Sequence, residues 1–260
     1  MTRPLHGYLR ELDSALVCFS GGVDSSYLLA EAVAALGTRA IAFTAVSPSL
    51  APEEKEAAAA LAQRLGAEHL LVATHELDDA RYQRNPVNRC YFCKTEVYGT
   101  ATRLAKERGI AHVLDGFNVD DRGDHRPGRR AAKELGVRSP LDDLGFRKAD
   151  IRREAEALGL PVWDKPALAC LASRFPYGTA ITPGALAQIA RAERHVRAMG
   201  FSIVRVRYFG SLARVEVDAA AVPRLQARRP ELVQRLEACG FSAIEIDPKG
   251  YRRGALNVLR

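Results

Sequence analysis

The stretch Ala-Leu-Val-Cys-Phe-Ser-Gly-Gly-Val-Asp-Ser-Ser, residues 15–26, decides the fold of this 260-residue chain. Its first five residues form a continuous apolar run, which is typical of a strand buried on both faces of a parallel sheet. Apolar residues then recur at helical spacing from Leu28 to Leu36, and Gly37 ends the pattern. A buried strand, a glycine pair and a helix in direct succession predict the first βα unit of an α/β fold.

The same alternation continues along the chain and predicts a parallel sheet with helices on both faces. The expected strands are residues 39–44, 69–73 and 112–115, and the expected helices are residues 24–36, 53–65, 90–108 and 148–158. Ligands of such sheets bind at the carboxyl ends of the strands. Ser20, Thr44 and Asp115 stand at those ends, so we expect them near the ligand.

A boundary is expected after the sheet, because Pro161, Pro166, Pro176 and Pro183 fall close together. We divide the chain into residues 1–178, a ligand-binding domain built on the parallel sheet, and residues 179–260, a small α+β domain for substrate binding or oligomerisation. The second domain is expected to contain helices at 184–199 and 225–239, a hairpin of strands 203–208 and 213–217, and a last strand at 243–246.

Composition places the chain among ordinary globular proteins, with 47% apolar and 27% charged residues. No apolar run approaches the roughly 20 residues of a membrane span, and the N-terminus lacks the apolar core of a signal peptide. We therefore expect a cytoplasmic protein. The net charge of +7 suits an anionic partner, although a solvated basic surface explains it equally well. Five cysteines, an odd number, argue against a disulfide framework.

The Ser-Gly-Gly-Val-Asp-Ser-Ser string has the properties of a phosphate site. Its glycines allow a tight turn and close approach of the backbone, and the following helix offers unpaired N–H groups with partial positive charge. Hydroxyls of Ser25 and Ser26 add donors, and Asp24 could help to hold a magnesium ion. A tight strand–helix turn with a polar cap is the alternative.

The string resembles the phosphate loop of the PP-loop ATP pyrophosphatase superfamily, and the lysine of a Walker loop is missing. The resemblance implies an adenine-nucleotide alpha-hydrolase-like fold and cleavage of ATP to AMP and pyrophosphate. It also implies a site for ATP and Mg²⁺ made of Ser20, Gly21, Gly22, Asp24, Ser25, Ser26, Thr44, Asp115, Gly116 and Arg126, with Asp24 on the magnesium.

Four further blocks narrow the resemblance. They are Val-Leu-Asp-Gly-Phe-Asn at 113–118 with two aspartates at 120–121, Arg-Pro-Gly at 126–128, Arg-Ser-Pro-Leu at 138–141, and Ala-Cys-Leu-Ala-Ser-Arg-Phe-Pro-Tyr-Gly-Thr at 169–179. From about residue 14 to Arg253 the chain is similar to the LarE family of ATP-dependent sulfur transferases. The family implies that a carboxylate of pyridinium-3,5-biscarboxylic acid mononucleotide is adenylylated and converted to a thiocarboxylate. This product leads to the nickel-pincer nucleotide cofactor of lactate racemase.

The family also implies roles for residues of the 169–179 block. Cys170 supplies the sulfur, and Ser173 and Arg174 belong to the same catalytic block. In members with a single active cysteine, that residue loses its sulfur and becomes dehydroalanine. Adenylylation creates a good leaving group, and a thiolate is the strongest nucleophile available, so this chemistry is reasonable.

The pair Cys90 and Cys93 departs from the single-cysteine pattern. A Cys-x-x-Cys spacing in a cytosolic protein serves a metal, a cluster or a redox pair. Cys90, Cys93 and Cys170 could ligate three irons of a [4Fe–4S] cluster and leave the fourth open for an extra sulfide. A subset of the family is thought to work in this way. Zinc, a redox disulfide and simple packing remain alternatives, whereas Cys18 and Cys239 are expected to pack in the core.

Arg205 and Arg207 alternate along one strand and therefore project from the same face. Two guanidinium groups on one face suit a phosphate monoester, although an exposed basic strand is the alternative. The family associates these two residues and Glu193 with the phosphate of the substrate. Lys94 and Lys148 also have functional potential, and the six histidines show no ligand spacing.

Three other functions stay open. A PP-loop tRNA thiolase would fit the cysteine pair, but no RNA-binding module is evident, so nucleic acid is not the expected partner. An ammonia-using ligase of the NAD- or GMP-synthetase type would leave Cys170 unexplained. A non-catalytic nucleotide sensor needs no reactive thiol. We expect a small nucleotide substrate and, from the family, a homo-oligomer.

Overall fold

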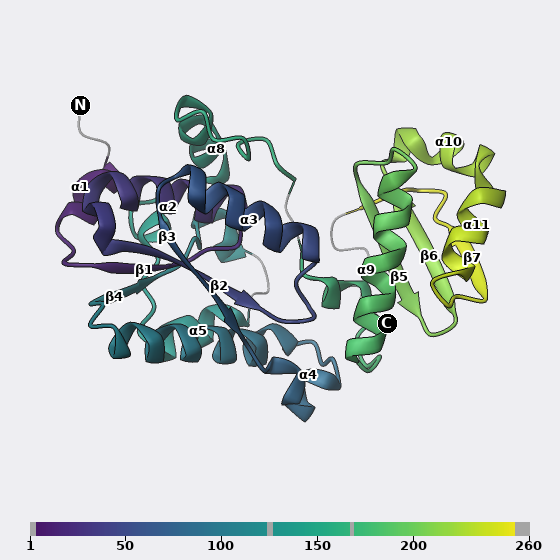
Figure 1. Cartoon of the computed structure of the whole chain (residues 1–260), viewed down its shortest axis with the longest axis horizontal. Helices are drawn as coiled ribbons and strands as arrows, with labels where there is room; N and C mark the ends of the chain where they lie inside the picture. Colours follow the sequence, from purple (N-terminus) through teal and green to yellow (C-terminus); the bar gives the residue numbers. More distant parts are fainter. Residues whose placement is uncertain (1–3, 124–126, 167–168, 253–260) are drawn as a thin grey trace. The chain divides into compact units, whose positions relative to one another are not determined.

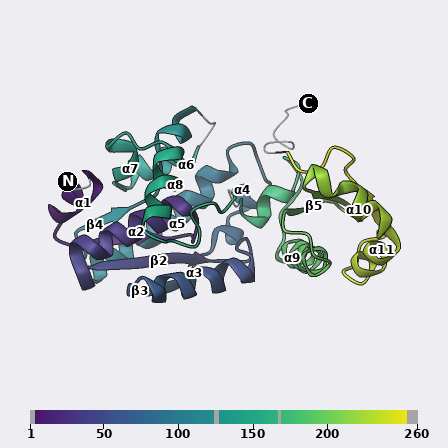
Figure 2. The ribbon, with the colours of Figure 1, turned by 90° about the horizontal axis from the view of Figure 1, so that it is seen from above.

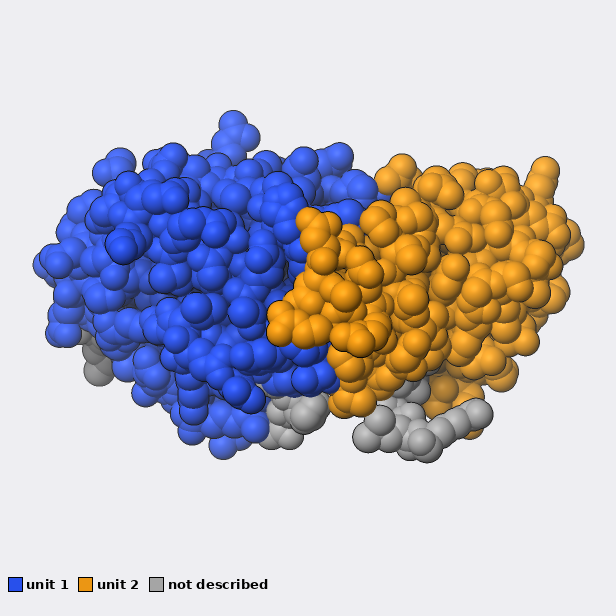
Figure 3. All heavy atoms as spheres, turned by 90° about the horizontal axis from the view of Figure 1, so that it is seen from below, with its two compact units in different colours: residues 1–76, 88–168 blue, residues 77–87, 169–260 orange. Residues whose placement is uncertain are grey.

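The computed structural model describes residues 4–123, 127–166 and 169–252. Arg126, which the sequence places in the nucleotide site, lies outside the described residues. The chain forms two compact units, coloured separately in Figure 3: residues 1–76 with 88–168, and residues 77–87 with 169–260. The division of function between domains 1–178 and 179–260, with ATP binding in the first and substrate binding or oligomerisation in the second, stays a prediction.

The first unit is built on a four-stranded parallel sheet in the order β3-β2-β1-β4. Its strands are β1 (Ala15–Cys18), β2 (Ala40–Val46), β3 (Glu68–Ala73) and β4 (His112–Leu114). Its helices are α1 (Pro4–Arg10), α2 (Val23–Leu36), α3 (Pro52–Arg64), α5 (Arg89–Glu107), α6 (Gly128–Glu134), α7 (Pro140–Asp143) and α8 (Lys148–Ala157), with 3₁₀ turns at Gly37–Arg39, Glu76–Asp78 and Val119–Gly123. The predicted α/β class is confirmed.

Side-chain alternation along the strands explains why helices cover both faces. Ala15 and Val17 of β1 pack with α2 and α3 in one core, whereas Leu16 packs with Ala101 and Ala105 of α5 in another. Figure 1 shows α2 and α3 above the strands and α5 below them. Both faces of β1 are therefore buried, as its continuous apolar run predicts.

The strand order reverses between β1 and β4. The chain passes from β1 to β2 to β3 and then returns to place β4 on the other side of β1. Such a reversal opens a crevice at the carboxyl ends of the two diverging strands, which is where α/β proteins bind ligands. The Ser-Gly-Gly loop follows β1, and Asp115 follows β4.

The second unit has a three-stranded sheet of order β5-β6-β7, made of β5 (Val204–Phe209), β6 (Leu212–Val217) and β7 (Ala243–Ile246). Its helices are α4 (Ala80–Gln83), α9 (Pro183–Ala198), α10 (Val222–Ala227) and α11 (Arg229–Glu237), with 3₁₀ turns at Leu171–Arg174 and Ala219–Ala221. The helix α9 packs along β5 (Figures 1 and 2), and apolar residues of α9, α10, α11 and all three strands share one core.

The structure corrects the sequence prediction at several elements. The helix expected over residues 225–239 is two helices, α10 and α11, because Pro230 lacks an N–H and stands in the first turn of a new helix. Residues Val119–Gly123, for which the sequence analysis predicts neither a helix nor a strand, form a 3₁₀ turn. The short helices α1, α4, α6 and α7 carry too few residues for a clear apolar period, and the sequence did not predict them.

Candidate active site

The phosphate loop connects β1 to α2 in the expected form. Gly21 has a φ of +70°, a conformation that residues with a Cβ rarely adopt, and Gly22 is the N-cap of α2. Ser25 Oγ donates to the Gly22 carbonyl at 3.1 Å and accepts from the Ser20 amide at 3.2 Å. These bonds close the loop on itself and leave the amides at the start of α2 available to an anion.

Ser26 adds an unused polar group to this loop. Its side chain is fully buried, and its Oγ has no hydrogen-bond partner among the described residues. A buried hydroxyl without a partner is costly, and a bound phosphate oxygen would satisfy it. The loop therefore suits an anion on physical grounds.

Gly116 packs against the same loop from the end of β4. A Cβ at this position would lie 3.0 Å from the Ser25 amide nitrogen and 3.2 Å from Asp24. A side chain here would force the start of α2 to move by a few tenths of an ångström, so glycine favours this close approach. The predicted nucleotide-site residues Ser20, Gly21, Gly22, Asp24, Ser25, Ser26 and Gly116 thus lie together.

Asp24 is held by two side chains from later in the sequence. Its Oδ2 pairs with the Lys148 ammonium, and its Oδ1 accepts from the Asn118 amide at 3.3 Å. A second lysine, Lys165, donates to the Gly21 carbonyl at 3.4 Å and to Glu54 at 2.8 Å. A carboxylate oxygen at a phosphate loop has the chemistry that Mg²⁺ prefers, so Asp24 suits the ion.

Asp115 is buried and engaged by the protein itself. Its Oδ1 accepts from Ser139 Oγ at 2.6 Å and from the Phe117 amide at 3.2 Å, and its Oδ2 accepts from the Tyr98 hydroxyl at 2.8 Å. Burial, followed by the charge of Asp115, raises the pKa of Tyr98 well above its usual value. These bonds fix the end of β4 and thereby hold Gly116 against the loop.

Thr44 is likewise engaged by its surroundings at the end of β2. Its hydroxyl donates to the Phe19 carbonyl at 2.6 Å and lies 2.8 Å from His69 Nε2. Because a hydroxyl has one hydrogen, His69 must donate through Nε2, which sets its tautomer. No role for His69 was predicted from the sequence. In the β2–β3 register His69 pairs with Ala42, two residues before Thr44, and its side chain reaches the Thr44 hydroxyl.

The second unit contains a buried cluster of arginines around the Cys170 segment. Arg174 is 2% exposed and forms a two-pronged ion pair with Glu193, at 2.8 and 2.9 Å. Its Nη1 also donates to the carbonyls of Ala169 and Cys170, at 2.7 and 3.1 Å. Arg174 therefore clamps the backbone that carries Cys170, whose side chain is exposed.

Glu193 is fully buried in α9 and contacts several members of the arginine cluster. Besides Arg174, it accepts from Arg197 at 2.7 Å and from the Val206 amide at 3.0 Å. Burial opposes ionisation, but the guanidinium of Arg174 outweighs it, so the pKa of Glu193 lies below its usual value. The same pairing raises the pKa of Arg174 in spite of its burial.

Arg205 and Arg207 project from β5 into this cluster, and both are 5% exposed. Arg207 pairs with Glu216 at 2.7 Å and donates to the Ser173 carbonyl at 3.1 Å, while its Nε is buried without a partner among the described residues. Burial and the nearby charge of Arg174 lower the pKa of Arg205. An additional anion would accept a hydrogen bond from Arg207 Nε and would favour the charged form of Arg205.

The arginines of the cluster suit an anion. Among the described residues, Arg174 and Arg197 pair with Glu193, and Arg207 pairs with Glu216. A phosphate monoester carries about −1.5 to −2 at neutral pH. The cluster therefore has the sign of charge that a nucleotide phosphate needs.

Arg197 and Glu216 are members that the sequence prediction missed, although signals for both exist. Glu193 and Arg197 are four residues apart on one helix, a spacing typical of ion pairs. Glu216 lies opposite Arg205 in the β5–β6 register, which follows once the two-residue turn at Gly210-Ser211 is recognised.

The five cysteines fall into two groups. Cys90 and Cys93 lie one turn apart on α5 in the first unit, and Cys170 lies in the second; Cys90 and Cys170 are exposed. No group of three or more potential metal ligands is present among residues 4–123, 127–166 and 169–252. Burial raises the pKa of Cys18 to about 12 and that of Cys239 above its usual value, as expected of packing residues.

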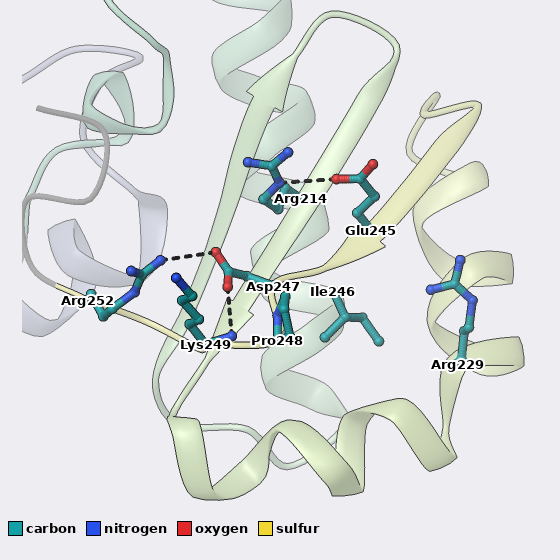
Figure 4. A pocket seen from close by; sticks show the side chains of 8 residues that line it. All are labelled: Arg214, Arg229, Glu245, Ile246, Asp247, Pro248, Lys249 and Arg252. Carbon is teal, nitrogen blue, oxygen red and sulfur yellow. Dashed lines mark hydrogen bonds and ion pairs between the residues drawn. The ribbon is translucent and has the colours of Figure 1, made fainter. Parts of the chain in front are cut away.

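A pocket of about 510 Å³ on the second unit involves none of the predicted site residues. Figure 4 shows that its charged side chains largely pair with one another, Arg214 with Glu245 at 3.1 Å and Arg252 with Asp247 at 3.5 Å. These pairs are part-exposed and partly neutralise each other. We therefore consider the phosphate loop of the first unit and the buried arginine cluster of the second unit, each by itself, as the candidate sites.

A parallel sheet with a glycine-rich phosphate loop at its strand-order reversal defines the class of α/β enzymes of the PP-loop type, which use ATP. In agreement, residues 9–113 match the asparagine synthase family. Among the described residues, no helix is long and apolar enough to cross a membrane.

Comparison with known proteins identifies the family. The chain is 47% identical to the uncharacterized protein slr1717 of Synechocystis sp., over 97% of this chain and 95% of the relative. It is 36% identical to the pyridinium-3,5-bisthiocarboxylic acid mononucleotide synthase of Lactiplantibacillus plantarum, over 96% and 91%. Protein MJ0830 of Methanocaldococcus jannaschii is 29% identical over 65% of this chain. The chain belongs to the family of the Lactiplantibacillus enzyme, the LarE family, and is an ATP-dependent sulfur transferase, as predicted.

Proposed function

We propose that this enzyme adenylylates a carboxylate of pyridinium-3,5-biscarboxylic acid mononucleotide and converts it to a thiocarboxylate, a step toward the nickel-pincer nucleotide. The main support comes from the buried arginine cluster of the second unit. Its charge suits a phosphate monoester, and its arginines also bind the backbone around Cys170. The product in the name of the Lactiplantibacillus relative supports the same substrate class.

The activation half uses the phosphate loop. Amides at the start of α2 and the hydroxyl of Ser26 would bind ATP phosphates, and Asp24 would hold Mg²⁺. A carboxylate oxygen of the substrate attacks the α-phosphorus, and pyrophosphate leaves. The resulting acyl-adenylate has a good leaving group, AMP, at the carbon that receives sulfur.

The sulfur half centres on Cys170. Arg174 fixes the Cys170 carbonyl, and Arg207 fixes the Ser173 carbonyl, so the exposed thiol projects from an immobilised backbone. Arg205, Arg207 and Glu193 would form the site for the substrate phosphate, and Arg207 Nε would be a donor to it, since it has no partner in the part of the chain that the structure describes. Ser173 orients Arg174, whose Nη1 donates to the Ser173 Oγ at 3.0 Å.

We further propose that Cys90, Cys93 and Cys170 bind a [4Fe–4S] cluster. The donor set fits by its chemistry, because all three are thiols and the first two lie one helical turn apart, facing the same side of α5. The bound cluster would supply a renewable sulfide to the activated carbonyl. Without it, the sulfur would come from Cys170 itself, which would be left as dehydroalanine.

The test is mass spectrometry of protein and product after incubation with ATP, magnesium and the biscarboxylate nucleotide. Thiolated product with intact protein, and iron and sulfide present after anaerobic purification, is expected. Loss of about 34 Da from the protein would show the sacrificial route at Cys170 and reject the cluster. Cys170→Ala should abolish product, whereas Cys239→Ala, a buried thiol of the same unit, should retain it.

The same experiment separates the other functions. Thiolated tRNA in a parallel assay, with no product from the biscarboxylate nucleotide, would favour a tRNA thiolase. Amide formation from ammonia would favour a synthetase. A protein that binds ATP and keeps its function as Cys170→Ala would be a sensor. From the family we also propose a cytoplasmic homo-oligomer, and light scattering coupled to gel filtration tests the oligomer.

A further inference from the structure

Asp24 is shared between two protein groups at the start of α2. Its Oδ2 pairs with the Lys148 ammonium, and its Oδ1 accepts from Asn118. The side chains of Asp24 and Lys148 are 23% and 31% exposed, so both remain accessible to a ligand. The Asp24 carboxylate, which we propose as a magnesium ligand, is therefore already paired with a cationic side chain of the protein.

Lys148 is fixed at its backbone but not along its side chain. Its amide, the first of α8, donates to Asp120 at 2.8 Å, which holds the main chain in place. The ammonium sits on a flexible four-carbon stem and can move by several ångström through rotamer changes alone. Lys148 can therefore leave Asp24 without any movement of the helix.

Lys165 provides an internal comparison. It is also a part-buried lysine at the phosphate loop, but its ammonium bonds to the Gly21 carbonyl and to Glu54 instead of Asp24. Neither acceptor belongs to the proposed magnesium site. The two lysines therefore differ in one respect that matters here, the carboxylate with which each pairs.

An ammonium and a divalent cation repel each other on one carboxylate, and the neutral amide of Asn118 offers no compensation. We propose that Lys148 and Mg²⁺ alternate on Asp24: the ion displaces the ammonium when Mg·ATP binds, and the released ammonium pairs with a phosphate oxygen of the same nucleotide. This proposal rests on the proposed role of Asp24 in magnesium binding.

The test begins with metal binding to the full-length protein without nucleotide, measured by Mn²⁺ electron paramagnetic resonance. Lys148→Gln should tighten Mn²⁺ binding by about tenfold, because it removes the competing cation. Lys165→Gln should leave the affinity unchanged, and Asp24→Asn should abolish binding. Circular dichroism of each variant checks that the fold is retained, as expected for part-exposed side chains.

Turnover provides the second readout and should change in the opposite direction. Lys148→Gln should slow pyrophosphate release by about 10²- to 10³-fold, the usual effect of removing one group that stabilises phosphate charge. Lys148→Arg, which keeps the charge, should recover part of the rate. Tighter metal binding together with slower turnover is the signature of the exchange.

Two results would overturn the proposal in distinguishable ways. Unchanged or weaker Mn²⁺ binding in Lys148→Gln, with binding lost in Asp24→Asn, would mean that Lys148 only positions Asp24, and the magnesium role of Asp24 would stand. Unchanged binding in Asp24→Asn would remove that role as well, because another group would then hold the ion.

Discussion

The two units of this enzyme offer an anion two different environments. The phosphate loop of the first unit uses backbone amides and hydroxyls, and its charged residues pair with one another, Asp24 with Lys148 and Lys165 with Glu54. The arginine cluster of the second unit uses full charges that are buried and paired with carboxylates.

This difference determines what each site tolerates. A backbone site depends on close approach and therefore on the absence of a Cβ, whereas a cluster of buried charges depends on every charge keeping its partner. We expect shape changes to damage the first unit and charge changes to damage the second. Two substitutions, each with a control, test this expectation, and a third removes a single hydrogen bond of the first unit.

The largest effect is expected for Arg174→Met in the second unit. Loss of the guanidinium leaves the fully buried Glu193 with too few partners, and breaking a buried pair costs about 3–5 kcal/mol. Urea unfolding gives the free energy, and hydrogen exchange should place the loss in α9 and β5. The reaction of Cys170 with a thiol reagent should change as well, since its backbone is no longer clamped.

Arg214→Gln is the matched control for that substitution. Arg214 also pairs with a glutamate in the second unit, but the pair is 41% and 52% exposed. Exposed pairs contribute about 0–1 kcal/mol, so stability should hardly change. Equal costs for the two arginines would show that burial is not what makes the cluster sensitive.

Gly116→Ala should have an intermediate effect, in the first unit. The new Cβ would lie 3.0 Å from the Ser25 amide and would push the loop out of position. A displaced binding group costs about 10- to 100-fold in kcat/KM for ATP, or roughly 1.4–2.8 kcal/mol. Pyrophosphate release measures this directly.

Gly99→Ala is its control, because among the described residues no atom beyond its chain neighbours and the adjacent helix backbone lies within 4 Å of the position of the new Cβ. Gly99 is inside α5, where alanine is favoured over glycine by about 0.5–1 kcal/mol. This variant should be slightly more stable with unchanged kcat/KM. If Gly116→Ala were equally harmless, the loop would not depend on close approach.

The smallest effect is expected for His69→Phe, and it should depend on pH. Burial lowers the pKa of His69 below its unfolded value of about 6.5, so the stability that it contributes is present above that pH and is lost as pH falls through it. The variant should lose about 0.5–1.5 kcal/mol at pH 8, because Thr44 loses its donor.

Urea titrations of wild type and variant between pH 8 and pH 5.5 check this prediction. The difference in stability between the two proteins should shrink toward low pH, where the buried imidazole becomes unfavourable in the wild type. A difference that stays constant over this range would contradict the expectation that burial lowers the pKa of His69.

Local patterns were sufficient for much of the fold. The strands of the parallel sheet and the helices α2, α3, α5, α8 and α9 fall within one or two residues of their predicted limits, because each carries a clear apolar period and a glycine or proline at its end. The split between α10 and α11 could have been foreseen from Pro230. The four-residue helices α4 and α7 could not, since four residues are too few to show an apolar period.

By itself, the sequence determined the phosphate loop, the parallel sheet and the family, because each depends on residues that are adjacent or regularly spaced along the chain. Only the tertiary structure decided which partners these residues have. It joined Asp24 to Lys148, 124 positions later, and showed that Arg174 binds Glu193 and the Cys170 backbone. Such pairings depend on strand register and helix packing, which bring together charges that no local pattern relates.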